Sequence, residues 1–272
     1  MSYNLRFLTP RDGINHWDHR KGLVVDLMKK EGADLIATQE GTSRTENVSV
    51  NSSGVPQQLA DLEWMFHGEF AWFGVAREDD GETCAILYRK SRFEVLEQNT
   101  FWLSEHPTQV GSLSWNSSCV RICTYGLFKD LHNGSRFYLY NCHLDHMSAL
   151  ASVKLIIQQA VTRVRDETPI FWTGDFNAVP TENSIKYIGD AKKNKYTFTD
   201  TSRLSTREHR GPIYTFSGFK HLDKEHIDFI FLRDTSNKIK VMDHETIFTP
   251  IDEKLGTPPS DHFPVQILFT ME

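Results

Sequence analysis

Acidic, amide and imidazole side chains of this sequence fall at or just beyond the ends of segments rich in β-branched and aromatic residues. Such segments predict strands, and side chains at strand ends can converge at one rim of a sheet. The residues placed in this way are Asn4, Glu40, His143, Asp145, His146, Asp175, Asn177, Asp228, Asp261 and His262. Together they predict one site that combines metal binding with proton transfer.

The oxygen donors of this set suit a hard divalent cation. Mg²⁺ binds one or two carboxylates in proteins and keeps several waters for a substrate phosphate. Glu40, Asp175, Asn177 and Asp261 supply carboxylate and amide oxygens of this kind. We therefore expect Mg²⁺ or Mn²⁺ as the cofactor.

The imidazoles of the set supply proton transfer. His143 and His262 are the groups best suited to exchange protons near neutrality. Each needs an orienting carboxylate, and Asp228 and Glu82 are available for this purpose. Two histidine–carboxylate pairs beside a metal site can hydrolyse a phosphate ester, because the metal polarises a phosphoryl oxygen while an imidazole activates water.

Strand-like segments outnumber helical ones along the chain. The predicted strands are 33–40, 83–89, 120–128, 137–141, 169–173, 227–232 and 264–270. Helical spacing of apolar residues predicts helices in 23–28, 56–66 and 150–164. Helices interspersed among strands predict an α/β fold with sheets faced by helices. The polar segment 46–54 is too short for a domain linker, so residues 1–272 are predicted to form one domain.

Composition excludes several classes of protein. The 272-residue chain carries a formal net charge of −6 at pH 7, which argues against a tight, non-specific binder of long nucleic acid. No apolar run approaches the ~20 residues of a membrane-spanning helix, and the first residues lack the apolar stretch of a signal peptide. The 4 cysteines include no C-x-x-C pair and are predicted to be free. These features predict a soluble, cytoplasmic protein.

Seven short motifs mark the predicted strand ends and the segments between them. They are YN at 3–4, DLIATQE at 34–40, YNCHLDH at 140–146, TGDFNAVP at 173–180, YTFSG at 214–218, HIDFIFL at 226–232 and SDHFPV at 260–265. Their identity and order resemble the endonuclease/exonuclease/phosphatase superfamily, which includes pancreatic-type deoxyribonucleases, over nearly the whole chain. The resemblance implies a metal-dependent phosphoric ester hydrolase. It also implies a four-layer α/β sandwich, with two mixed β-sheets packed face to face, helices outside and the site at one end.

The resemblance assigns a metal-binding half of the site by position. It implies that Glu40 is the main metal ligand, with Asn4 beside it and Asp261 adding a metal or phosphate contact. Asp175 and Asn177 would position the attacking water and bind phosphate or a second metal. The number of metal ions stays open.

The resemblance also implies a proton-transfer half. His262, paired with Asp228, would be the general base or a phosphate donor, and these two roles stay open. His143, held by Glu82, would stabilise or protonate the departing group and contact substrate together with Asn177. Arg121, inside a predicted strand, is expected to bind phosphate. For Asp145 and His146, shaping a loop and binding a second ion are equally compatible with their position.

The substrate class stays open at this stage. A phosphorylated small molecule, such as a sugar phosphate or lipid headgroup, and a short nucleic acid are both compatible with the motifs. Alternatives are a deadenylase-like exonuclease or nuclease for single strands and a non-catalytic phosphate-binding relative. A zinc hydrolase is a further alternative, because HLDH resembles part of an H-x-H-x-D-H signature, but Asn141 stands where its first histidine belongs.

Some residues are expected to lie outside the site. The stretch 11–21, RDGINHWDHRK, and FWLS at 101–104 resemble a group of small bacterial and fungal members of the superfamily. Arg11 and Arg20 of this stretch are expected to be solvated. Four further histidines are expected at the surface, namely His209, His221, His226 and His244.

Overall fold

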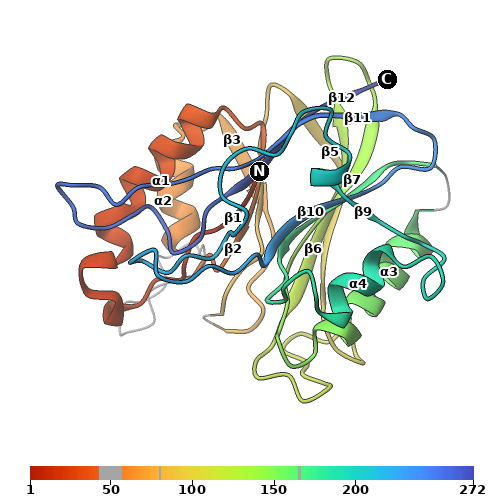
Figure 1. The fold of residues 1–272 in the computed structure, drawn as a ribbon, viewed down its shortest axis with the longest axis horizontal. Helices are drawn as coiled ribbons and strands as arrows, with labels where there is room; N and C mark the ends of the chain where they lie inside the picture. The colour runs from red at the N-terminus through yellow and green to blue at the C-terminus, as the bar shows by residue number, and fades with distance from the viewer. Residues whose placement is uncertain (43–56, 80, 165–166) are drawn as a thin grey trace.

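Two β-sheets lie face to face, and helices cover the outer face of each (Figure 1). The structure, a computed structural model, describes residues 1–42, 57–79, 81–164 and 167–272. In Figure 1 the helices α1 and α2 lie on one side of the pair of sheets, and α3 and α4 lie on the other. The predicted four-layer α/β sandwich is therefore confirmed.

Each sheet has six strands. The first sheet has the order β11 (Ile239–Thr246), β12 (Val265–Met271), β1 (Ser2–Asn4), β2 (Leu35–Gln39), β4 (Ile86–Arg89) and β3 (Phe70–Phe73). The second has the order β5 (Phe93–Trp102), β6 (Ile122–Asp130), β7 (Arg136–His143), β8 (Ile170–Asp175), β10 (Asp228–Arg233) and β9 (Thr199–Asp200). The helices are α1 (Trp17–Glu31), α2 (Gln57–Met65), α3 (Ala149–Arg163) and α4 (Asn183–Gly189), with 3₁₀ turns η1 (Pro10–Asn15) and η2 (Thr201–Arg203).

One parallel strand pair in each sheet sets the position of the site. β1 runs parallel to β2, so that Asn4 pairs with Gln39, and Glu40 follows directly. β7 runs parallel to β8, so that His143 pairs with Asp175. Because the carboxyl ends of parallel strands meet at the same edge, these side chains share one rim of the sandwich.

Apolar side chains fill the space between the sheets and the space under the helices. The inter-sheet cluster includes Ile86, Phe128, Phe137, Phe171 and Val265. Under α3 the cluster includes Val153, Ile156, Ile157 and Trp172. Each such side chain contributes roughly 1.5–3 kcal/mol by burial.

Asn141 is a polar exception within the inter-sheet core. Its Oδ1 accepts a hydrogen bond from Gln39 Nε2 at 2.7 Å, which links β7 to β2 across the two sheets. Its Nδ2 donates to the backbone oxygens of Thr38 and Ala85 at 2.8 and 2.9 Å. The side chain is fully buried, and its oxygen and both N–H groups are engaged within the protein.

Gly174 permits the close approach of β7 and β8 beside the site. Its φ is +150°, and a Cβ at this position would lie 2.0 Å from the backbone oxygen of Cys142. A larger residue would push the two strands apart immediately before Asp175.

Each predicted strand and helix overlaps an observed one, but β3, β5, β9, β11 and α4 were not predicted. The strand β5 shows why, because alternate side chains such as those of Glu94 and Gln98 face solvent and make the segment read as a polar loop. All four cysteines are free, as predicted. The polar segment 46–54 lies outside the described residues. Within the described part of the chain, no helix is long and apolar enough to cross a membrane.

The prediction that four histidines lie at the surface is wrong for His244. His244 is buried on the unpredicted strand β11, and its Nδ1 lies 2.8 Å from His209 Nδ1. His209, His221 and His226 are half-buried. Arg11 is exposed as expected, whereas Arg20 is fully buried, because it lies on the inner face of α1.

Candidate active site

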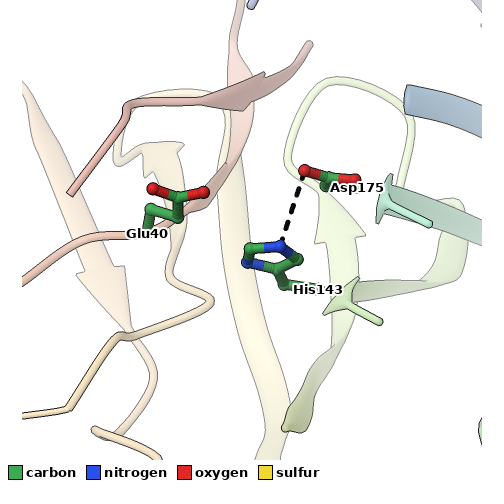
Figure 2. A group of neighbouring side chains, drawn as sticks. All are labelled: Glu40, His143 and Asp175. Carbon is green, nitrogen blue, oxygen red and sulfur yellow. Dashed lines mark ion pairs between the residues drawn. The ribbon is translucent and has the colours of Figure 1, made fainter. Parts of the chain in front are cut away.

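Three side chains from two sheets converge at the rim of the sandwich. Glu40 follows β2, His143 ends β7 and Asp175 ends β8, and Figure 2 shows them facing one another. One ligand atom of each lies within 4.8 Å of the others, and His143 Nε2 lies 3.5 Å from Asp175 Oδ2. Residues separated by 135 positions in the chain therefore form one cluster.

Asn4 bridges the two carboxylates of this cluster. Its Nδ2 donates to Glu40 Oε1 and to Asp175 Oδ2, both at 2.9 Å. Its Oδ1 accepts from the backbone nitrogen of Arg6 at 2.8 Å, so the amide nitrogen faces the acidic groups. Asn4 thus orients the carboxylates on which a cation would bind.

The backbone around the cluster is held in conformations that non-glycine residues rarely adopt. Glu40 has a φ of +62° and Asn177 a φ of +46°. The backbone nitrogen of Phe7 donates to Glu40 Oε2 at 2.8 Å, and that of Asn177 donates to Asp175 Oδ1, also at 2.8 Å. Left-handed conformations cost on the order of 1–3 kcal/mol each and are commonest at functional sites. Here the two left-handed residues lie where backbone N–H groups hold the carboxylates of Glu40 and Asp175 in place.

A second group shares Asp175 with the first. Asp175, Asp228 and His262 also have ligand atoms within 4.8 Å of one another. His262 Nδ1 lies 2.8 Å from Asp228 Oδ2, and its Nε2 lies 3.8 Å from Asp175 Oδ2. Burial lowers the pKa of His262, but the carboxylates of Asp228 and Asp175 outweigh burial and raise it to about 10. The imidazole is therefore protonated at neutral pH.

The other side of His143 faces a charged network. Glu82 Oε2 lies 3.3 Å from His143 Nδ1, and Arg121 Nη1 donates to Glu82 Oε2 at 3.1 Å and lies 2.9 Å from His143 Nδ1. Asn177 Nδ2 lies 2.9 Å from His143 Nε2. Burial raises the pKa of Glu82, but the neighbouring imidazole and two guanidinium groups outweigh it and lower the pKa to about 2. Glu82 is thus a carboxylate that can hold the imidazole in place.

Asp261 is buried beside the two groups without joining either. It belongs to neither group of converging ligand atoms found among the described residues. Its carboxyl is buried and Oδ1 lies 3.3 Å from Ser260 Oγ. Burial raises the pKa of Asp261, and the charge of His262 opposes this rise.

The neighbouring residues Asp145 and His146 lie in different surroundings in the structure. Asp145 is buried, and its Oδ2 accepts hydrogen bonds from the backbone nitrogen and the hydroxyl of Ser118. It therefore anchors the loop that precedes β6. His146 is exposed and belongs to neither group of converging ligands within the described part of the chain.

One charged residue of this site was not found from the sequence. Arg77 forms a 3.0 Å ion pair with Glu82 Oε2, the same oxygen that Arg121 contacts. Its backbone oxygen accepts from Trp102 Nε1 at 2.6 Å. No motif includes Arg77, so the sequence carried no signal for it.

Comparison with known proteins identifies the family. The family described as endonuclease/exonuclease/phosphatase matches residues 1–262. The chain belongs to this family. The family membership that the seven motifs predict is therefore confirmed.

Solved structures of this family superpose on the whole chain. An endonuclease/exonuclease/phosphatase from Bacteroides vulgatus is 32% identical with a TM-score of 0.83, covering 100% of this chain and 97% of that one. A mannosyl-6-phosphatase from Bacteroides thetaiotaomicron is 28% identical with a TM-score of 0.80, covering 99% and 98%. TDP2 from D. rerio, complexed with single-strand DNA product, shares the fold at 17% identity and a TM-score of 0.72, covering 99% and 97%.

The donor set of this endonuclease/exonuclease/phosphatase member fits a hard divalent cation. A carboxylate oxygen of Glu40 and one of Asp175 lie within 4.8 Å of each other. The neutral side-chain amide of Asn4 donates a hydrogen bond to both carboxylates. Like charges at this distance repel, and a bound cation would offset that repulsion. In addition, Asp228 Oδ1 is buried and has no hydrogen-bond partner among the described residues. The chemistry of these groups thus matches a family that acts on phosphate esters.

Proposed function

We propose that this protein is a divalent-metal-dependent hydrolase of phosphate esters whose substrate is a phosphorylated small molecule. One observation carries the proposal: the cluster of Glu40, His143 and Asp175 adjoins the His262–Asp228 pair at one rim. The combination of acidic ligands with two oriented imidazoles suits phosphoryl chemistry. A non-catalytic relative is disfavoured, because no member of this set is missing.

Glu40 and Asp175 would hold Mg²⁺ or Mn²⁺, with Asn4 fixing both carboxylates and Asp261 close by. When bound, the cation would polarise the phosphoryl oxygen and offset its charge. Side chains of the protein would orient the attacking water and accept its proton. Asp175, whose Oδ1 is fixed by the backbone nitrogen of Asn177, presents Oδ2 toward His262. In this position it can orient the attacking water and accept its proton.

His262 is proposed to hold the phosphate. Asp228 fixes its Nδ1, which leaves Nε2 directed at the space beside Asp175 Oδ2. A pKa of about 10 supports a protonated ring that donates to a phosphoryl oxygen. Of the two roles left open by the motifs, we therefore propose the phosphate donor.

His143, Asn177 and Arg121 are proposed to stabilise the transition state from the opposite side. The ring of His143 lies between Asn177 Nδ2 and the Arg121 guanidinium, each 2.9 Å from one ring nitrogen. Glu82 balances the arginine charge and keeps the ring oriented. We propose that, with substrate bound, these groups donate to the phosphoryl and leaving-group oxygens as charge develops there.

The small-molecule substrate rests on two observations. The net charge of −6 disfavours long nucleic acid as a substrate. The chain is also 28% identical, over 99% of its length, to a protein named as a mannosyl-6-phosphatase. We therefore propose a sugar phosphate or a similar phosphomonoester in preference to a single-stranded nucleic acid.

A substrate panel tests this proposal. Phosphate release from mannose 6-phosphate, glucose 6-phosphate and a 5′-phosphorylated single-stranded oligonucleotide is measured with Mg²⁺ and with Mn²⁺. Nucleotide release from the oligonucleotide is followed in parallel. We expect turnover of at least one sugar phosphate to exceed that of the oligonucleotide, and Asp175→Asn to lower it by at least about 100-fold. Faster oligonucleotide cleavage would overturn the substrate class, and turnover unchanged in Asp175→Asn would overturn the site.

A further inference from the structure

Arg20 is a buried cation whose partners are backbone oxygens. Its side chain has 0% exposure, and within the described residues it forms no ion pair with a carboxylate. Its guanidinium carbon lies 5.2 Å from the ring centre of Trp17 and 5.6 Å from that of Phe219. Burying an arginine without such a pair is costly unless its N–H groups are satisfied. An arginine at this position therefore needs a structural reason.

Four carbonyls from three chain segments supply that reason. Arg20 Nε donates to Asn15 O in η1 at 2.9 Å. One terminal nitrogen donates to Leu5 O and to Pro259 O at 2.5 and 2.9 Å, and the other donates to Arg6 O at 2.8 Å. The planar fork of a guanidinium can make these bonds simultaneously, whereas an ammonium group cannot reach all four.

The segment after β1 positions two residues of the cation site, Asn4 and Glu40. Asn4 is positioned by the backbone nitrogen of Arg6, and Glu40 by that of Phe7. Arg6 has a φ of +58°, which must be held by its surroundings. Its carbonyl accepts from Arg20 and also from Gln58 Nε2 at 2.9 Å. Loss of the guanidinium would remove one of the donors that the described residues place on this carbonyl.

The segment before β12 bears Asp261. Pro259, which Arg20 contacts, directly precedes Ser260 and Asp261. Ser260 Oγ donates to the backbone oxygen of Asn4 at 2.7 Å, so the two segments also touch each other beside the acidic groups. The same guanidinium thus ties together the chain segments that bear Asn4 and Asp261.

We infer that Arg20 is a positioning residue of the cation site, which it builds by clamping the segments 4–7 and 259–261 against α1. This inference rests on the proposed function, because it assumes that Glu40, Asp175 and their neighbours bind a divalent cation. The buried positive charge also lies close enough to interact with Asp261 and Glu40. Arg20 therefore contributes geometry and charge without touching the substrate.

Mn²⁺ binding by the purified protein tests the inference, with free Mn²⁺ measured by electron paramagnetic resonance. Arg20→Lys keeps the charge and loses the fork, and we expect it to raise the Mn²⁺ dissociation constant at least about tenfold. Ile156→Ala, on the buried face of α3, is a destabilised control away from the segments 4–7 and 259–261, and we expect it to bind Mn²⁺ like the wild type. Equal Mn²⁺ affinity in Arg20→Lys and wild type would overturn the inference.

Hydrogen–deuterium exchange of the metal-free protein provides a second readout. We expect Arg20→Lys to speed exchange in residues 4–8 and 259–263, including the Phe7 amide that binds Glu40, but not in α3. Exchange that rises equally everywhere, or nowhere, would overturn the inference. If the wild type binds no Mn²⁺, the proposed function fails, and the exchange pattern alone then decides whether Arg20 is the clamp.

Discussion

Asp228 Oδ2 lies 2.8 Å from His262 Nδ1, although the two residues are 34 positions apart and His262 lies outside the strand that Asp228 begins. Both side chains are buried. Asp228 begins β10 of one sheet, and His262 belongs to the segment that leads into β12 of the other. The pairing fixes the direction of the imidazole and places its Nε2 beside Asp175.

Breaking this pair should reduce catalysis more than stability. We expect His262→Asn and Asp228→Asn each to lower kcat by roughly 100-fold or more, because a charged, oriented N–H donor is lost. The measurement is steady-state hydrolysis of p-nitrophenyl phosphate with Mg²⁺. His132→Asn changes an exposed histidine in the turn between β6 and β7 and serves as the matched control. A loss of less than about tenfold in His262→Asn would show that its role is misassigned.

The buried amide of Asn141 should matter for stability. Asn141→Leu would leave the oxygens of Thr38 and Ala85 and the Gln39 amide without this partner inside the core. We expect the free energy of unfolding to fall by about 2–4 kcal/mol, since unsatisfied buried polar groups cost about 1–3 kcal/mol each. Urea denaturation followed by tryptophan fluorescence measures it. Asn133→Leu, on an exposed turn, is the control, and an equal, small change in both variants would contradict the assignment.

His244 should make the fold sensitive to acid. Burial lowers its pKa to about 4, although the carboxylates of Asp200 and Asp243 oppose this, while His209 and His226 face the same ring and add to the lowering. The folded pKa lies below the ordinary value of 6.5, so protonation favours the unfolded state. The neutral ring thus contributes stability that is present above about pH 6.5 and is lost as the pH falls toward about 4.

The variant His244→Gln isolates this effect. We expect the wild type to lose roughly 1–3 kcal/mol of unfolding free energy more than the variant between pH 7 and pH 4, because each unit of pKa shift corresponds to about 1.4 kcal/mol. Arg207 and Arg210 pair with Asp243 and stay charged over this range, so they are common to both proteins. Chemical denaturation at a series of pH values gives the comparison. Parallel pH profiles for the two proteins would refute a neutral, buried His244.

The sequence predicts those parts of the fold in which local pattern and tertiary role agree. β2, β7 and β8 combine apolar runs with polar ends, and these ends carry Glu40, His143 and Asp175. Their convergence depends on the parallel pairing of β1 with β2 and of β7 with β8, which only the structure reveals. β5 escapes prediction because Phe93–Trp102 alternates buried and solvent-facing side chains at the edge of its sheet.

Long-range polar contacts cannot be predicted in this way. An arginine at position 20 is expected from the sequence to be solvated. In the structure Arg20 is buried, and one of the carbonyls that it contacts belongs to Pro259, 239 positions away. Arg77 pairs with Glu82 inside a hairpin that carries no motif. Nothing in local composition distinguishes such an arginine from a surface one, so only the assembled structure reveals it.

The most direct test of the account is whether hydrolysis depends on a divalent cation held at Glu40. Protein stripped with EDTA is assayed on p-nitrophenyl phosphate before and after addition of Mg²⁺ or Mn²⁺, alongside Glu40→Gln. We expect no hydrolysis after stripping and full recovery with metal in the wild type. At the same metal concentration, we expect the rate in Glu40→Gln to be at least roughly 100-fold lower. Hydrolysis that persists in EDTA, or a Glu40→Gln variant as active as the wild type, would contradict the account.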